Sequence, residues 1–88
     1  MNKDRRKEIA SIEARVEELR DLLDGIKSDV ENIRDEEQDY FDNMPESFQQ
    51  ADKGQTAEEA VSALDETISA LEDFDIDTIL GYLADAAA

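Results

Sequence analysis

The chain has 88 residues and a formal net charge of -16, from 9 Lys and Arg against 25 Asp and Glu, with no His and no Cys. This length allows one small domain with little room for a private core. Charge of this sign opposes direct binding to nucleic acids and to anionic membranes, and it favours basic protein partners. Because cysteine is absent, no disulfide framework is possible.

The N-terminal segment shows no targeting signal. Residues 1–10, MNKDRRKEIA, are rich in bases, but no apolar segment follows them. No apolar run approaches the ~20 residues that a membrane-spanning helix needs. We therefore expect a cytoplasmic protein.

The first predicted element is a long helix over residues 3–42. Its apolar residues recur at alternating steps of three and four, which is a heptad repeat: Ile9, Ile12, Val16, Leu19, Leu23, Ile26, Val30 and Ile33. Such a stripe packs either between chains, as a coiled coil, or within its own chain. Gly25 costs about 1 kcal/mol relative to Ala inside a helix. The repeat keeps its phase across Gly25, so we expect a continuous helix.

A corner with a short helix is predicted over residues 43–55. The heptad repeat fails where Glu37 and Tyr40 take the next two core positions. Asn43 can then cap the helix that follows, and Pro45 is well placed as the first residue of a new helical turn. Gly54 is expected to close this short helix.

A second helix is predicted over residues 56–74 and a short last helix over residues 76–86. Thr56 and Glu59 form a capping box, and Asp75 or Asp77 can cap the last helix. The apolar stripe of the second helix consists of Ala57, Val61, Leu64, Ile68 and Leu71. The fold class is therefore all-α, a single domain in which the second helix runs antiparallel to the first as a helical hairpin.

The second helix is about half as long as the first helix of about 60 Å, so it can cover only the later part of the first helix unless the last helix continues along it. Two helices also leave much of each apolar stripe exposed to water, so self-association is expected. The simplest product is a homodimer that closes a coiled coil or a four-helix bundle. Charges flanking the repeat favour an antiparallel or offset pairing. A parallel, in-register pair would make two like-charge contacts and one attractive contact: Glu8 with Glu13, Arg15 with Arg20, and Asp29 with Arg34.

Acidic residues are concentrated in the corner and the C-terminal part. Residues 35–46 contain six acids and no base, and residues 55–88 contain nine acids and no base. Such a surface can simply keep the protein soluble. However, a net charge of magnitude ~2–8 is enough for the solubility of a small domain, and the net charge of -16 exceeds that range. A dimer over about 60 Å would carry one net charge per ~1.9 Å, close to the ~1.7 Å of duplex DNA. The sharper interpretation is therefore mimicry of nucleic acid.

Catalysis and metal binding are disfavoured. Without His and Cys, only carboxylates, Ser, Lys and Tyr could act as base or nucleophile, and no Gly-rich phosphate loop is present. Asp73, Asp75 and Asp77 have the spacing of a calcium loop. However, Thr78 stands where that loop needs Gly, and Ala84 stands where it needs Glu. We expect no catalytic residue, metal or cofactor.

The corner EEQDYFDNMPESFQ, the basic start RRKEI and the acidic helix rich in Ala, Glu, Leu and Ile together resemble a family of small acidic helical proteins. That family occurs in bacteriophages, prophages and other mobile elements and is largely uncharacterised. The resemblance implies a mobile-element setting and the host cytoplasm, and it carries over no functional residue. By analogy, small and very acidic phage proteins include inhibitors of host defence and of host nucleic-acid enzymes, several of them DNA mimics.

These features predict a non-enzymatic inhibitor that binds a basic, nucleic-acid-binding surface of a host protein, as a DNA mimic or anti-defence protein. Tyr40, Phe41 and Phe48 either pack the corner or anchor the partner, and packing is favoured. The alternative is a structural or assembly coiled-coil protein whose acidic surface only solvates it. The expected partner-binding residues are Asp35, Glu36, Glu37, Asp39, Tyr40, Asp42 and Glu46.

Overall fold

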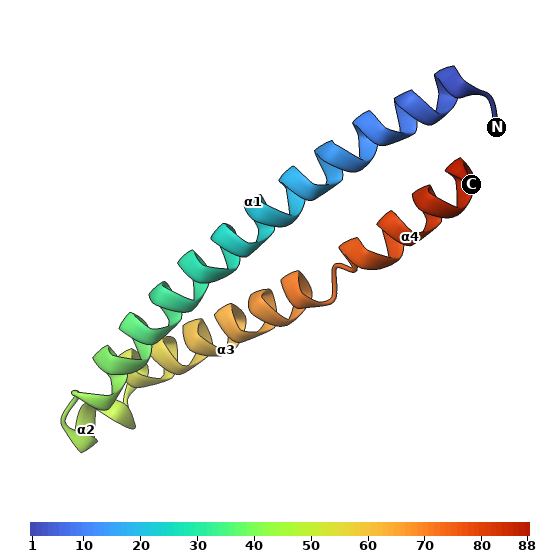
Figure 1. Cartoon of the computed structure of the whole chain (residues 1–88). Coiled ribbons are helices and arrows are strands. Elements are labelled where there is room, and N and C mark those ends of the chain that lie inside the picture. The colour runs from blue at the N-terminus through green and yellow to red at the C-terminus, as the bar shows by residue number, and fades with distance from the viewer. The chain divides into compact units, whose positions relative to one another are not determined.

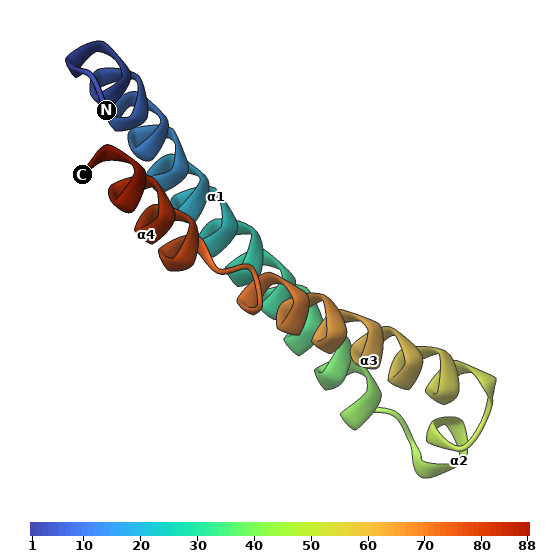
Figure 2. The same ribbon diagram turned by 90° about the vertical axis from the view of Figure 1, so that its right-hand side faces the viewer.

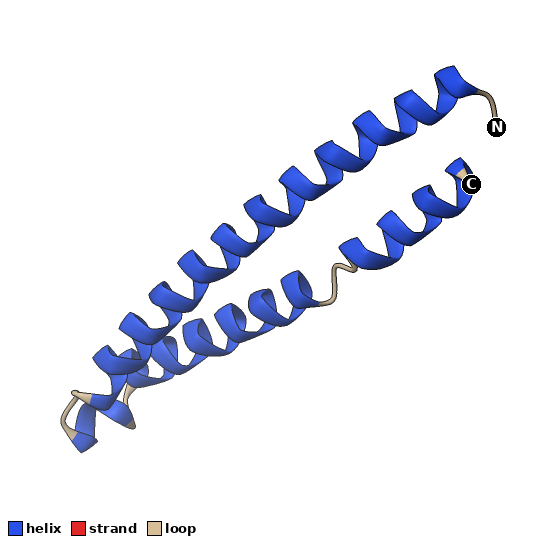
Figure 3. Cartoon of the chain, in the orientation of Figure 1, coloured by secondary structure: helices blue, strands red, loops and turns tan.

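The computed structural model describes residues 1–88 and consists of α-helices joined by short turns, with no strand (Figures 1 and 3). The helices are α1 (Lys3–Asp42), α2 (Glu46–Gln49), α3 (Asp52–Glu72) and α4 (Ile76–Ala87). The predicted all-α class is confirmed, as are the long N-terminal helix and the corner after it. The chain divides into two compact units, one of Met1–Gly25 with Phe74–Ala88 and one of Ile26–Asp73.

The first unit pairs the N-terminal part of α1 with α4. Ile9 of α1 and Ile76 of α4 are buried, while Val16, Leu23 and Leu80 are half-buried. The two segments run in opposite directions, since the N and C termini lie at the same end of this unit (Figures 1 and 2). Arg20 donates a hydrogen bond to Asp77 at the opposite end of the pair.

The second unit pairs the C-terminal part of α1 with α3 and includes α2. Ala57 and Ile68 of α3 are buried, and Val30 and Phe41 of α1 are half-buried. Two ion pairs join α1 to α3: Lys27 with Glu72, and Arg34 with Asp65. Because the later residue of α1 meets the earlier residue of α3, the two segments are antiparallel.

The heptad repeat of α1 divides into two rows with different burial. Ile9, Val16, Leu23 and Val30 are buried or half-buried, as a row that packs within the chain requires. The other row, which we call the outer row, is exposed: Ile12 (43%), Leu19 (38%), Ile26 (49%) and Ile33 (53%). The side of α1 that packs extends instead from the first row to Arg20, Lys27 and Arg34, all of them half-buried. Thus only half of the predicted seam is used inside the chain.

The corner differs from the prediction in which residues begin and end its helices. Helix α3 begins at Asp52, so Thr56 lies inside it and the predicted capping box does not form. Pro45 precedes α2 as its N-cap rather than beginning it. The Asn43 side chain donates to the Asp39 carbonyl at 2.8 Å and so satisfies the end of α1 instead of capping α2.

Gly54 is buried in the first turn of α3 and does not close α2. Its φ is not positive, so the left-handed conformation of a helix-ending glycine is not the reason for glycine here. A Cβ at this position would overlap the carbonyl group of Gln49. Glycine is therefore required by the close approach of the α2 backbone to the start of α3.

Helix α4 is capped by Asp75, one of the two predicted candidates. Its carboxylate accepts hydrogen bonds from the Thr78 backbone N–H at 2.9 Å and from the Thr78 hydroxyl at 2.6 Å. These bonds, the hydroxyl bond foremost, lower the pKa of Asp75 below its usual value. The capping hydrogen bonds therefore stabilise the charged form of the carboxylate.

We predict that Gly54→Ala destabilises the second unit by about 1–3 kcal/mol, because the added methyl group forces the backbones of α2 and α3 apart. Gly25→Ala is the matched control, since a Cβ there would meet nothing within 4 Å. It should stabilise α1 by up to about 1 kcal/mol. Urea unfolding followed by circular dichroism measures both changes. Equal effects of the two substitutions would contradict the close contact.

We predict that Asp75→Asn destabilises the chain at neutral pH and that the difference from the wild type disappears in acid. The pKa of Asp75 in the folded chain lies below its unfolded value of about 3.9. The stabilisation is therefore present above about pH 4 and is lost as the pH falls through the folded pKa. Thermal unfolding at a series of pH values measures this difference. In Thr78→Val, which lacks the hydroxyl donor, the stabilisation should be smaller and its loss should be complete at a higher pH than in the wild type.

Candidate acidic interface

The seven predicted partner-binding residues lie in the second unit, at the end of α1 and the start of α2. All are exposed except Glu37, which is half-buried. Helical spacing distributes them over more than one face of α1. Asp35 and Asp42 share one face, Glu36 and Tyr40 share another, and Glu37 follows Val30 in the packed row. The structure thus brings the residues to one end of the unit without placing them on a single surface.

The three aromatic residues of the corner have different environments. Phe41 is half-buried, and Gln49 donates a hydrogen bond to its carbonyl at 3.1 Å. Tyr40 and Phe48 are each 52% exposed. The expected packing role is therefore met by Phe41 alone, while Tyr40 and Phe48 leave apolar surface beside the acids. A groove in the second unit is lined by residues of α1 and α3: Gln38, Phe41, Glu58, Val61, Ser62 and Asp65.

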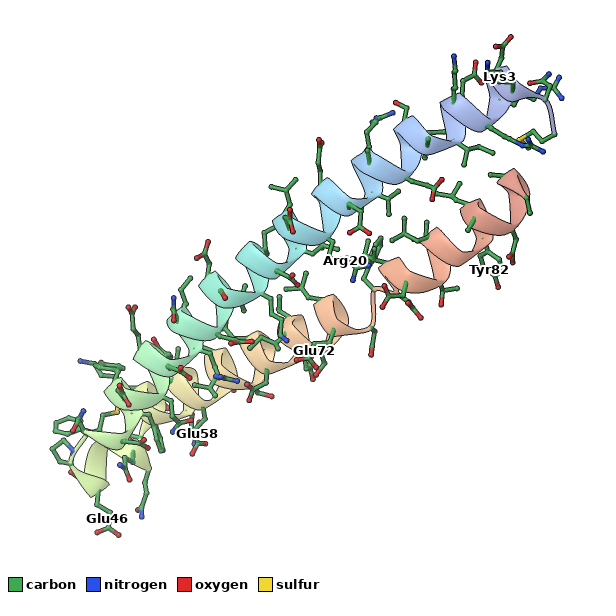
Figure 4. The ribbon with its side chains drawn as sticks, in the orientation of Figure 1. Lys3, Arg20, Glu46, Glu58, Glu72 and Tyr82 are labelled. Atoms are coloured by element: carbon green, nitrogen blue, oxygen red, sulfur yellow. The ribbon has the colours of Figure 1, made fainter.

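Cross-helix ion pairs are the feature that sequence analysis missed. Arg20, Lys27 and Arg34 follow one another at heptad spacing. Each pairs with an acid on the helix opposite it: Arg20 with Asp77, Lys27 with Glu72, and Arg34 with Asp65 (Figure 4 shows Arg20 and Glu72). The acidic surface of residues 55–88, which contain no base of their own, is therefore partly compensated by bases of α1. The regular spacing of the three cations was the signal that could have revealed this.

These hydrogen bonds stabilise the charged guanidinium groups. The pKa of Arg20 is raised by its bonds to Asp77 and Glu17, and the pKa of Arg34 by its bonds to Asp65 and Asp35. Both cations remain charged at any physiological pH. The charge that each contributes to the helix pairing therefore does not change with pH in this range.

The corner acids remain largely without cations. Asp35 pairs with Arg34 at 3.0 Å, and Asp42 accepts a hydrogen bond from Gln38 at 2.9 Å. The six ion pairs of the chain include none of Glu36, Glu37, Asp39, Asp42 and Glu46. Glu46 points outward at the tip of the corner (Figure 4). Exposed carboxylates of this kind can accept charge-assisted hydrogen bonds from Lys and Arg side chains.

Two further features of the chain bear on its chemistry. No group of three or more acidic side chains is placed to hold a metal ion. None of the four helices combines the length and the apolar character needed to cross a membrane. Asp75, the central acid of the calcium-like spacing, instead uses its carboxylate to cap α4.

Comparisons of the chain with protein-family models, curated proteins and solved structures found no match. The resemblance to acidic proteins of mobile elements therefore stays a prediction.

We predict that Lys27→Glu destabilises the second unit by about 1 kcal/mol, because it removes the ion pair to Glu72 and adds an acid beside it. The double variant Lys27→Glu/Glu72→Lys should recover most of this loss, since it restores the pair with reversed signs. Urea unfolding measures the three chains. Lys3→Glu is the matched control, because it makes the same charge change at a residue outside the six ion pairs. If Lys3→Glu lowered the free energy of unfolding as much as Lys27→Glu, the effect would be due to net charge and not to the ion pair.

Proposed function

We propose that this chain is a non-enzymatic acidic interaction protein that binds a basic, nucleic-acid-binding surface of another protein and blocks it. The carrying observation is the division of charge along α1. Arg20, Lys27 and Arg34 are engaged in helix pairing, whereas Glu36 and Asp39 are exposed and take part in no ion pair. The corner thus presents negative charge that the chain's own cations do not neutralise.

The proposed mechanism is competition for Lys and Arg side chains. A protein that binds nucleic acid arranges these cations to meet phosphate oxygens, and carboxylates can accept the same charge-assisted hydrogen bonds. The net charge of -16 also accelerates the encounter with a basic surface. Exposed Tyr40 and Phe48 would add apolar contact at the edge of this polar interface. A bound chain would exclude nucleic acid by occupying the same cations.

The biological setting in this proposal is a mobile element. An origin in a phage or prophage, which the resemblance implies, would make the partner a host protein and the site of action the host cytoplasm. The function would then be that of a DNA mimic or anti-defence inhibitor. The proposed homodimer would double the acidic surface presented to the partner.

A second candidate function is structural or assembly work through coiled-coil contacts. The exposure of the outer row, Ile12, Leu19, Ile26 and Ile33, favours it, since apolar residues at heptad spacing are typical of helix–helix contacts. The acidic surface would then only solvate the chain. The two functions differ in which residues they need, so charge reversal separates them.

We predict that Glu36→Lys/Asp39→Lys/Asp42→Lys weakens capture of nucleic-acid-binding proteins by about tenfold or more, through the loss of three exposed charge contacts. The measurement is recovery from bacterial lysate on the immobilised chain, followed by elution with duplex DNA or high salt. The matched control is Glu59→Lys/Glu66→Lys/Asp73→Lys. It makes the same charge change at exposed α3 positions and at the residue after α3, outside the ion pairs, and should retain capture.

Two outcomes would reject the proposal. Retained partners that ignore both duplex DNA and salt would exclude mimicry, because mimicry requires competition for the same cations. Normal capture by the corner variant, with helicity intact, would assign the acidic surface a solvating role and favour the assembly function.

A further inference from the structure

The groove of the second unit lies where a regular series of ion pairs between α1 and α3 is interrupted. The series has one pair per heptad, each with an N–O distance of 2.9 Å: Lys27 with Glu72, and Arg34 with Asp65. The next step of the same antiparallel register, one heptad later on α1 and one heptad earlier on α3, sets Phe41 opposite Glu58. Both residues line the groove, as this register requires. Phe41 therefore stands where the series would need a cation.

Glu58 is the acid of this series that has no cation. Its side chain is exposed, and it takes part in none of the ion pairs and none of the side-chain hydrogen bonds of the chain. Apolar neighbours lower the local dielectric, so a carboxylate beside Phe41 attracts a cation more strongly than one surrounded by water. Glu58 is thus placed to pair with a cation from outside the chain.

The shape of the groove suits a single long side chain. Its apolar part is formed by Phe41 of α1 and Val61 of α3, both half-buried. Its volume is about 240 Å³. Pockets for drug-sized ligands are larger, at ~300–1,000 Å³. Lys and Arg side chains lay their aliphatic stems along apolar surface and keep the charged end near water. A side chain of this kind would match both the apolar part of the groove and the charge at its edge.

The polar atoms of the groove favour arginine over lysine. Besides the Glu58 carboxylate, the groove offers the Ser62 hydroxyl and the side-chain carbonyl oxygen of Gln38. The Gln38 amide nitrogen donates to Asp42 at 2.9 Å, which leaves that oxygen free to accept. A guanidinium carries five donors in one plane and can stack on the face of an aromatic ring such as that of Phe41. An ammonium has three donors about one point and cannot stack.

We propose that this groove binds an arginine side chain of the basic partner, with its stem against Val61, its guanidinium over Phe41 and its donors on Glu58. The inference rests on the proposed function, because that function supplies a partner rich in cations. The bound arginine would complete the interrupted series of ion pairs from outside the chain. Since Phe41 lies within the acidic segment 35–46, one partner can contact both the groove and the corner acids.

The ligand class is tested with two small probes of equal charge, Nα-acetyl-arginine amide and Nα-acetyl-lysine amide. We expect the arginine probe to shift the backbone amide NMR signals of the purified chain around Phe41, Glu58 and Val61, with a Kd on the order of 1–10 mM. The lysine probe should bind at least about threefold more weakly, since it lacks the planar group. Equal binding of the two probes, or shifts spread over every acidic segment, would overturn the proposal.

The site is tested by charge removal within α3. Glu58→Gln should weaken binding of the arginine probe by about fivefold to tenfold, because it removes the charge and keeps the size of the side chain. Glu59→Gln is the matched control. It makes the same change at a neighbouring exposed acid that lies outside the groove lining and the ion pairs, and it should leave binding unchanged. Equal effects of the two substitutions would assign binding to net charge and overturn the proposal.

The ring is tested by Phe41→Leu, which keeps an apolar surface and removes the aromatic face. It should reduce the preference for the arginine probe over the lysine probe, with helicity unchanged by circular dichroism. An unchanged preference in the folded variant would overturn the stacking of the guanidinium on Phe41.

These measurements use the purified chain, so their outcome is separate from that of the capture experiment. If the arginine probe did not bind while capture still required Glu36, Asp39 and Asp42, the groove would not be an arginine site and the proposed function would stand. If the probe bound at Glu58 while the wild type captured no nucleic-acid-binding protein, the groove would be an arginine site and the proposed function would be rejected.

Discussion

The structure depends on how α1 pairs with the segment that returns beside it in each unit. The apolar part of this contact is narrow, with Ile9 and Ile76 buried in one unit and Ala57 and Ile68 in the other. Heptad-spaced cations on α1 border the apolar line and reach acids on the facing helix. Exposed ion pairs contribute little energy individually. Here they support a narrow apolar contact between helices whose net negative charge otherwise opposes close packing.

The pairing of these cations with acids of the facing helices decides which acidic and apolar residues stay exposed. The cations nearest the corner are committed to α3, so most corner acids have no internal partner. The same pairing turns one row of the heptad repeat inward and leaves the outer row exposed. The chain therefore presents two surfaces of different chemistry, one acidic and one apolar. The proposed function uses the first of these surfaces, since its acids can meet the Lys and Arg side chains of a basic protein.

Much of the fold was predictable because helix periodicity is a local property. The long first helix, the restart after Pro45 and the cap at Asp75 all follow from residues within one or two turns of each other. The corner was less predictable, since Gly54 is required by a backbone contact with Gln49 rather than by its own φ. The acidity of the candidate interface was visible in the sequence. Helical spacing divides its acids over different faces of α1, and only the packing of α1 decided that Glu37 is half-buried while the others are exposed.

By itself, the sequence determined that the chain is helical, strongly acidic and without His or Cys, because composition and apolar spacing fix these properties. Only the tertiary structure decided which half of the heptad repeat is buried. An alternating three–four pattern contains two rows, and its periodicity does not state which one meets the returning helix. The positions of Arg20, Lys27 and Arg34 opposite acids of that helix resolve the choice, since ion pairing turns their side of α1 inward. The row of Ile12, Leu19, Ile26 and Ile33 is left exposed as a consequence.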